Sequence, residues 1–164
     1  MFRKMRRSIQ QLSDAEAIEI LQSGTNGVLA LSGDGGYPYA VPLSYVYSDG
    51  CIYFHSALSG HKMDAVLRCD KASFCVVAQD EILPEKYTTA FKSVIAFGRI
   101  RVMDEGEKLN AVLKLAERYN PGHPAESLAE AEKGLRAMNM LEFKIEHITG
   151  KQGKELLKQP DQNN

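Results

Sequence analysis

The sequence predicts a mainly β protein with added helices (α+β), built as a small antiparallel barrel of about six strands. Three observations favour this fold. Short apolar runs rich in Val, Ile, Tyr and Phe recur between glycine-containing turns, which is typical of strands. The first three runs are joined by loops too short for the crossovers that parallel strands need. A length of 164 residues with 44% hydrophobic content fits one domain with a substantial core.

The first predicted element is a short helix that begins near Asp14. Ser13 and Glu16 have the spacing of a capping box, and apolar residues follow at helical intervals as far as Gly24. Three strands come next, joined by glycine-rich turns that predict hairpins. The expected strand ranges are 27–32, 37–47 and 51–56.

Longer strands are predicted in the second half of the chain. After a second short helix that ends near Arg68, strands are expected over 72–78, 91–103 and 140–148. Residues 79–90 contain a proline and mixed polar residues, which indicates an irregular crossing segment. Gly98, inside an apolar strand, predicts a bulge or a close backbone approach.

Two helices are expected before the last strand. Asp104 is placed to cap the first, and the second covers about 125–137. The apolar stripe of the first helix is expected to consist of Leu109, Val112, Leu113 and Ala116. A short helix follows Gly150. The whole is predicted to be a single domain over 1–155, with a basic arm over 1–12 and a polar tail over 156–164.

Composition excludes several classes of partner. The chain has 20 basic and 21 acidic residues and a net charge of -1, which argues against nucleic-acid binding. No run approaches the ~18 consecutive apolar residues of a membrane-spanning helix, and no apolar segment follows the basic arm as in a signal peptide. We therefore expect a cytoplasmic protein with no membrane partner.

The cysteines do not predict a disulfide framework or a metal centre. Cys51, Cys69 and Cys75 make an odd count without a paired spacing, and we expect reduced thiols. A metal site built from Cys51, His55 and His61 lacks a compact pair of ligands, so no metal is predicted.

The segment 52–64 carries the most informative chemistry. It ends a strand with His55 and Ser56, turns through a glycine, and opens a helix with His61 and Lys62. A hydroxyl, the free N–H groups of a first helical turn and cationic side chains thus converge, which is what a phosphate dianion needs. The alternative is that His55 is an ordinary core histidine and Lys62 a solvated lysine.

Several segments, taken together and in order, resemble the nitroimidazole-resistance (Nim) flavoproteins of the pyridoxamine phosphate oxidase-like superfamily. The segments are 26–31, 37–47, 52–57, 60–65, 73–77, 93–99 and 145–151, which together extend over nearly the whole chain. The resemblance implies a split β-barrel that binds FMN. It also implies a homodimer in which each cofactor lies at the subunit interface and contacts both chains.

The resemblance further implies which residues hold the cofactor. Ser56 and Lys62, with neighbouring Ala57 and His61, match the phosphate-holding segment, and Ser93 matches a polar residue that reaches the flavin from the partner subunit. The strand expected along the flavin ring contributes Val41, Pro42, Leu43 and Ser44. Arginines that the pyridoxamine-type oxidases carry near Val41 and at His61 are missing, so a phosphorylated pyridoxamine is not the expected substrate.

The expected activity is an FMN-dependent oxidoreductase that reduces nitroimidazole or nitroaromatic small molecules. His55 matches a histidine that Nim-like proteins carry near the flavin, and it is the candidate catalytic proton donor. FAD in place of FMN, and haem as a minor possibility, stay open. The alternative function is a flavin- or haem-binding module without catalytic turnover.

Overall fold

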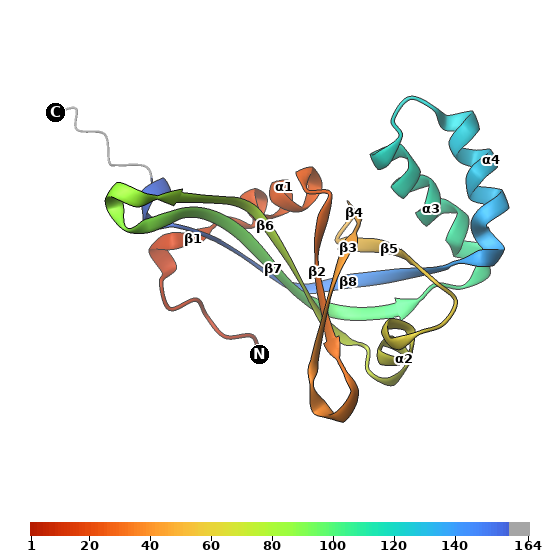
Figure 1. The fold of residues 1–164 in the computed structure, drawn as a ribbon, viewed down its shortest axis with the longest axis horizontal. Coiled ribbons are helices and arrows are strands. Elements are labelled where there is room, and N and C mark those ends of the chain that lie inside the picture. Colours follow the sequence, from red (N-terminus) through yellow and green to blue (C-terminus); the bar gives the residue numbers. More distant parts are fainter. Residues whose placement is uncertain (158–164) are drawn as a thin grey trace.

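The strands form one antiparallel sheet that curls on itself (Figure 1). The computed structural model describes residues 1–157. The eight strands are β1 (Gln11–Leu12), β2 (Asn26–Ser32), β3 (Pro38–Ser44), β4 (Val46–Ser48), β5 (Cys51–Ser56), β6 (Lys71–Leu83), β7 (Thr88–Val102) and β8 (Asn139–Gln152). Their order is β3-β2-β6-β7-β8-β5-β4, and β1 pairs with β8.

A single residue joins the two ends of this sheet. β3 ends at Ser44 and β4 begins at Val46, so strands at opposite ends of the sheet are consecutive in the chain. Tyr45, between them, is fully buried, and its N–H donates to the Thr25 carbonyl at 3.3 Å. The sheet must therefore curl until its ends meet. This confirms the predicted antiparallel barrel with helices.

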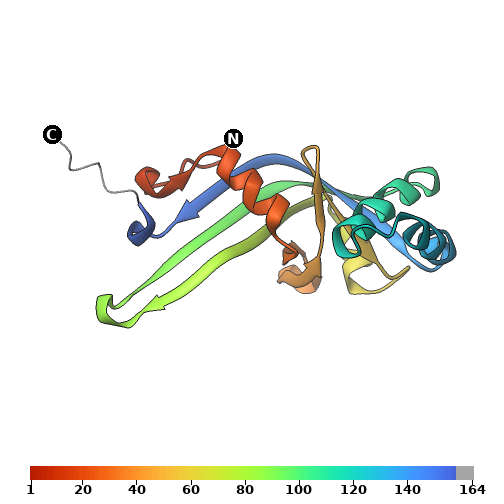
Figure 2. The same ribbon diagram turned by 90° about the horizontal axis from the view of Figure 1, so that it is seen from above.

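Four helices surround the barrel, and each lies close to its predicted range. They are α1 (Asp14–Ser23), α2 (His61–Arg68), α3 (Glu105–Tyr119) and α4 (Pro124–Gly134). The predicted capping box of α1 is confirmed, because the Ser13 N–H donates to Glu16 Oε2 at 2.9 Å. Figure 2 shows α1 lying against the sheet, while α3 and α4 form a pair at the end of the molecule opposite the β6–β7 turn.

The core fills the barrel and continues beneath α3. Phe54 and Phe74 are fully buried and meet edge to face, with ring centroids 5.2 Å apart. Tyr45 meets Phe74 in the same way at 4.9 Å. Between α3 and the sheet lies a second, smaller cluster that consists of Tyr53, Met103, Ala111, Leu115 and Met140. Apolar contacts in this cluster thus hold α3 against β5 and β8.

The prediction of an irregular segment over 79–90 was wrong. After a bulge between Val77 and Gln79, β6 and β7 stay paired as far as Leu83 and Thr88. They form a two-stranded arm that Figure 1 shows extending away from α3 and α4. Such an arm has little core to face, so its hydrophobic alternation is lost while the backbone pairing continues. Pro84 lies in the turn, where it interrupts no strand.

The sheet has eight strands where six were expected. Tyr45 splits the strand predicted over 37–47 into β3 and β4, and the two-residue strand β1 could not be recognised from pattern. β8 continues to Gln152, and the short helix predicted after Gly150 follows it as a 3-10 turn over Lys154–Leu156. The predicted bulge at Gly98 is confirmed, because the register of β7 and β8 shifts there.

α3 buries a stripe adjacent to the predicted one. Its buried residues are Lys108, Ala111 and Leu115. The ammonium of Lys108 pairs with Glu105 and donates to the Met138 carbonyl at 3.3 Å, so the aliphatic stem of the lysine is buried. The residues of the predicted stripe are all half-buried.

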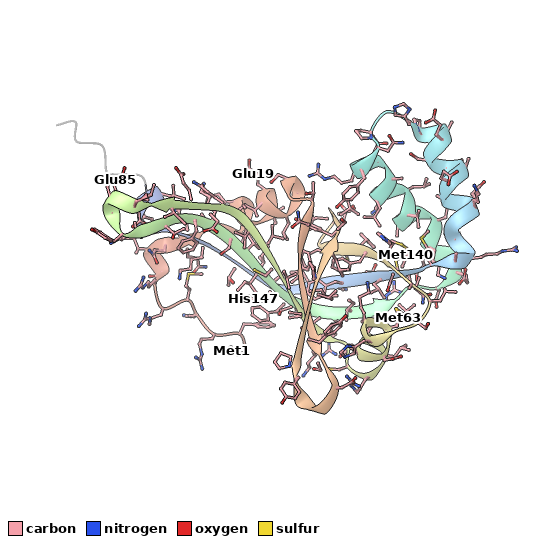
Figure 3. All side chains as sticks on the ribbon, in the orientation of Figure 1. Met1, Glu19, Met63, Glu85, Met140 and His147 are labelled. Atoms are coloured by element: carbon pink, nitrogen blue, oxygen red, sulfur yellow. The ribbon has the colours of Figure 1, made fainter. Side chains whose placement is uncertain are left out.

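The outward face of the sheet is apolar and bears the N-terminal arm. A row of directly paired residues crosses five strands, and it consists of Pro42, Val28, Cys75, Ile95 and Thr149. The Phe2 ring stacks on His147 with centroids 4.5 Å apart; Figure 3 labels His147 and the neighbouring chain end. Within residues 1–157, no helix has the length and apolar character to cross a bilayer. Most of the predicted polar tail lies outside the described residues.

Candidate functional site

The last two residues of β5 point their side chains to opposite faces of the sheet. Residues alternate along a strand, and here His55 is exposed while Ser56 is only 4% exposed. Ser56 pairs with Asn139 of β8, and His55 pairs with Met140. One strand end therefore supplies a buried hydroxyl to one environment and an accessible imidazole to another.

The loop after β5 is held so that α2 begins close to the strand end. The Asn139 side-chain amide donates to the Leu58 carbonyl at 3.2 Å. Gly60 turns the chain into α2 with φ 120°, a conformation that side chains with a Cβ rarely adopt. Met63, buried in the first turn, anchors the helix in the core. No side chain caps the N-terminus of α2, so its first N–H groups can bind an anion.

Lys62 is a half-buried cation without a partner among residues 1–157. It makes no hydrogen bond or ion pair with any described residue, and burial lowers the pKa of its ammonium group. The Ser56 hydroxyl likewise makes no hydrogen bond within the described chain. A desolvated cation in the first turn of an uncapped helix, six residues after an unused hydroxyl at a strand end, fits a phosphate group. We call Ser56, Lys62 and the start of α2 the phosphate corner.

His61, predicted in the phosphate-holding segment, has an aromatic and an acidic neighbour. Its ring stacks on Tyr39 at a centroid distance of 4.0 Å, and its Nε2 lies 3.5 Å from Asp34. Asp34 also pairs with Arg68 at 2.8 Å. His61 thus contacts the β2–β3 hairpin and has a carboxylate of its own. Ala57 is exposed in the loop after β5.

The residues predicted along the flavin ring divide between the two faces of β3. Val41 and Leu43 pack against the barrel core, whereas Pro42 and Ser44 are exposed on the outward face. Ser44 and His55 line the same cavity, so the structure brings these two predicted residues together.

This cavity lies between the barrel and the α3–α4 pair and has a volume of about 580 Å³. One wall is a stripe of α3 that includes Val112 and Leu115, and the other is a face of α4 that includes Glu126 and Glu130. Met138, which lies in the chain between α4 and β8, also lines the cavity. The volume is in the range of small-molecule sites. We call it the α3–α4 cavity.

Tyr119 connects this cavity to the place where the barrel closes. Its hydroxyl accepts from the Tyr45 N–H at 3.0 Å and donates to the carbonyl of Thr25 or Tyr45. The neighbouring Arg118 guanidinium donates to the Ser23 carbonyl. The C-terminal turn of α3 is therefore attached to α1 and to the junction of β3 and β4.

Ser93 lies far along β7 from the end of β5, but it is two residues from Ile95, which shares a row of paired residues with Pro42 of β3. It pairs with Val77 and Lys151, nine positions before Val102, which pairs with Leu141 beside Phe54 of β5. At ~3.3 Å per residue this separation is about 30 Å. Ser93 is on the same outward face as Ile95.

Several residues of the site had no signal in the sequence. Tyr119, Glu126, Glu130, Met138 and Asn139 lie 60 or more residues after β5 and reach it only through the fold. The described residues contain no group of three or more His, Cys, Asp or Glu arranged to bind a metal. Cys51, Cys69 and Cys75 are free and half-buried, and burial raises the pKa of Cys51 and Cys75.

The curled antiparallel sheet, with the α2 start after β5, defines a split-barrel protein of the pyridoxamine phosphate oxidase-like class. The family described as "Pyridoxamine 5'-phosphate oxidase" matches residues 13–152, and the chain belongs to this family. This confirms the superfamily that the sequence motifs indicated. No curated protein matches the sequence.

Solved structures share the fold. A conserved hypothetical protein from Mycobacterium tuberculosis has a TM-score of 0.80 at 18% identity, with 98% of each chain covered. A FAD and haem binding protein from Mycobacterium smegmatis has a TM-score of 0.78 at 22% identity, covering 93% of this chain and 77% of that one. A candidate 5-nitroimidazole antibiotic resistance protein from Bacteroides thetaiotaomicron has a TM-score of 0.68 at 16% identity, covering 86% and 85%.

Proposed function

We propose that this protein is a homodimeric, FMN-dependent oxidoreductase that reduces nitroimidazole or nitroaromatic small molecules. The observation that carries the proposal is that Lys62, half-buried and without a hydrogen bond or ion pair to any of residues 1–157, opens the helix that follows the strand end with the accessible His55. The fold shared with a FAD and haem binding protein and with a candidate nitroimidazole resistance protein supports it.

The phosphate corner would hold the cofactor phosphate. The Lys62 ammonium and Ser56 hydroxyl would donate to phosphate oxygens, together with the first N–H groups of α2. The outward residues of β3, Pro42 and Ser44, would lie along the flavin ring, with Ser44 close to the α3–α4 cavity. FAD would use the same corner for one of its phosphates.

The apolar outward face supports the homodimer. Val77 is 64% exposed, Ile95 40% and Phe97 37%, and exposed apolar side chains on one face of a sheet favour association with a second copy. Ser93 is on this face. In a twofold dimer it would complete the cofactor site of the partner.

His55 would supply a proton to the acceptor. Reduction of a nitro group to a nitroso group takes up two electrons and two protons and releases one water molecule. The flavin, when bound and reduced, supplies the two electrons. The His55 imidazolium would donate one proton to the nitro oxygen that leaves as water, and solvent would supply the other. The apolar wall of α3 would limit the access of water to the acceptor.

Oxidation of pyridoxamine phosphate is not part of the proposal. His61, which stands where the pyridoxamine-type oxidases have an arginine, is engaged with Tyr39 and Asp34. The described α3–α4 cavity has no lysine or arginine among its lining residues, so it offers no cation for a second phosphate.

The test starts with the visible absorption spectrum of the freshly purified protein, where the two bands of an oxidised flavin are expected. The flavin is then reduced with dithionite without oxygen, and its reoxidation by a 5-nitroimidazole is compared with reoxidation by air. Faster reoxidation by the nitro compound, with formation of the nitroso product or its reduction products, is expected. Colourless protein that takes up no FMN would refute the proposal.

The second candidate function is a flavin- or haem-binding module without turnover. It is favoured by the exposed His55 in a largely apolar cavity that also contains Met138, because both side chains are axial haem ligands in proteins. Here a Soret band would replace or accompany the flavin bands. His55→Ala would remove that band, and nitro compounds would not reoxidise the flavin faster than air.

A further inference from the structure

We propose that the α3–α4 cavity selects its acceptor by charge, and prefers a small flat acceptor that carries an amine to one that carries a carboxylate. This inference rests on the proposed function, because it names the class of acceptor that would bind beside His55. It depends on the wall contributed by α4, which none of the sequence motifs includes.

The two helical walls of the cavity have different chemistry. The α3 wall presents Val112, Leu115 and Ala116, at positions that form one apolar stripe. The α4 wall presents Glu126 and Glu130, which are one helical turn apart and therefore on the same face. A flat ring can pack on the first wall while a substituent on the ring faces the second.

The permanently charged side chains that line the cavity are both acidic. Two carboxylates line it, and its lining residues include no lysine or arginine. His55 is the one lining side chain that can become cationic, and it lies on the barrel side. An ammonium substituent is therefore attracted to the α4 wall, and a carboxylate substituent is repelled by it.

The preference should be modest because both carboxylates are near solvent. Their side chains are 74% and 78% exposed; the His123 imidazole lies 3.2 Å from Glu126, and the Lys133 ammonium lies 3.6 Å from Glu130. At about 7 Å in water, one charge pair changes an affinity about threefold, and physiological salt reduces this further. Exchanging an ammonium for a carboxylate on the acceptor turns two attractions into two repulsions. After screening by salt, the combined effect should be about a fivefold preference for the amine over the carboxylate.

The experiment uses three 2-methyl-5-nitroimidazoles that differ only in the substituent on N1: 2-aminoethyl, 2-hydroxyethyl and carboxymethyl. Their dissociation constants are measured by calorimetry with the purified full chain, with its flavin oxidised. Their rates of reoxidation of the reduced protein are measured in single turnover without oxygen. We expect tightest binding and fastest reoxidation at low concentration for the aminoethyl compound, and a larger preference at low salt.

The variants separate a charge effect from other effects. In the double variant Glu126→Gln and Glu130→Gln, the ratio of the aminoethyl to the carboxymethyl affinity should fall from about fivefold to near one. Glu132→Gln is the matched control, because it removes one carboxylate from α4 outside the cavity lining. Ratios between variants cancel any difference in reduction potential among the three compounds.

The outcomes distinguish this inference from the proposed function. If the compounds reoxidise the flavin without any charge preference, or if the preference survives the double variant, the inference is wrong while the reductase activity stands. If charge-dependent binding is lost in the double variant but no compound reoxidises the flavin, the acceptor class holds and the reductase function is refuted.

Discussion

The phosphate corner and the α3–α4 cavity differ in charge, in burial and in the length of chain that builds them. The phosphate corner takes a cation and a hydroxyl from residues six positions apart, Ser56 and Lys62, and burial lowers the pKa of the lysine. The α3–α4 cavity draws on β3, β5, α3 and α4, and its α4 wall carries two carboxylates. The strand end of β5 belongs to both. One environment is therefore suited to an anion that stays bound, and the other to a neutral or cationic molecule that exchanges.

The largest expected effect comes from His55. His55→Ala should lower the rate of reoxidation by a nitro compound about 100-fold, the size typical of losing a general acid, while the affinity for FMN stays within about twofold. Reoxidation is followed in a stopped-flow instrument, and FMN affinity by titration of the flavin-free protein. Unchanged reoxidation with full flavin occupancy would remove His55 from the mechanism.

Substitution of Lys62 should show the reverse pattern, in which FMN affinity rather than the reoxidation rate is lowered. Lys62→Met removes a charge-assisted hydrogen bond of about 2 kcal/mol, so FMN should bind about 30-fold more weakly. The same variant should leave the melting temperature of the flavin-free protein unchanged or raised, because an unpaired half-buried charge is gone. Lys154→Met, at a lysine that is 75% exposed, is the control. Equal FMN affinity in the two variants would show that the phosphate binds elsewhere.

A smaller effect is expected from pH. The pKa of Lys62 lies below its ordinary value of 10.5 in the flavin-free protein, and a bound phosphate would raise it. FMN affinity should therefore fall as the pH rises through the lowered pKa of the free protein. The stability of the flavin-free protein should rise over the same range, because the unfolded chain then binds more protons than the folded one.

Both slopes should be absent in Lys62→Met. Affinity is measured by FMN fluorescence and stability by urea unfolding, at pH values from neutral up to 10. If FMN affinity and the stability of the flavin-free protein changed in the same direction with pH, the titrating group would not be Lys62.

The smallest expected effect concerns Tyr119, which supports the cavity but not the phosphate corner. Tyr119→Phe removes the hydroxyl that bonds to Tyr45 and Thr25, at a cost of about 1 kcal/mol, or about 3 °C in melting temperature. The Michaelis constant for the acceptor should rise, and FMN affinity should not change. Tyr37→Phe is the control, because Tyr37 is 78% exposed and its hydroxyl makes no hydrogen bond within residues 1–157. Equal melting temperatures for the two variants would mean that the hydroxyl contributes nothing.

Local features of the chain were predictable because each depends on neighbours in sequence. The α1 capping box, the end of α2 at Arg68 and the bulge at Gly98 all follow from spacing or from a single glycine. The two-stranded arm over 79–90 was not predictable. Hydrophobic alternation arises only where a strand has one buried face, and this segment lies beyond the barrel.

The residues of the candidate site also divide into those that the sequence could indicate and those that it could not. His55, Ser56 and Lys62 could be singled out because a strand end, a turn and a helix start bring them together within a few residues. Tyr119, Glu126, Glu130 and Asn139 could not, because nothing in the local sequence distinguishes them from other polar residues on helices and strands.

The sequence by itself determined the antiparallel strands, the helix positions and the chemistry of the strand end at β5, since these depend on propensity, capping and short-range spacing. Only the tertiary structure decided that β3 and β4 meet through a buried Tyr45, that His61 turns to Asp34, and that α3 and α4 enclose a cavity beside His55. The physical reason is that these contacts join segments tens of residues apart. Their cost in chain entropy is offset only by the packing of the whole barrel.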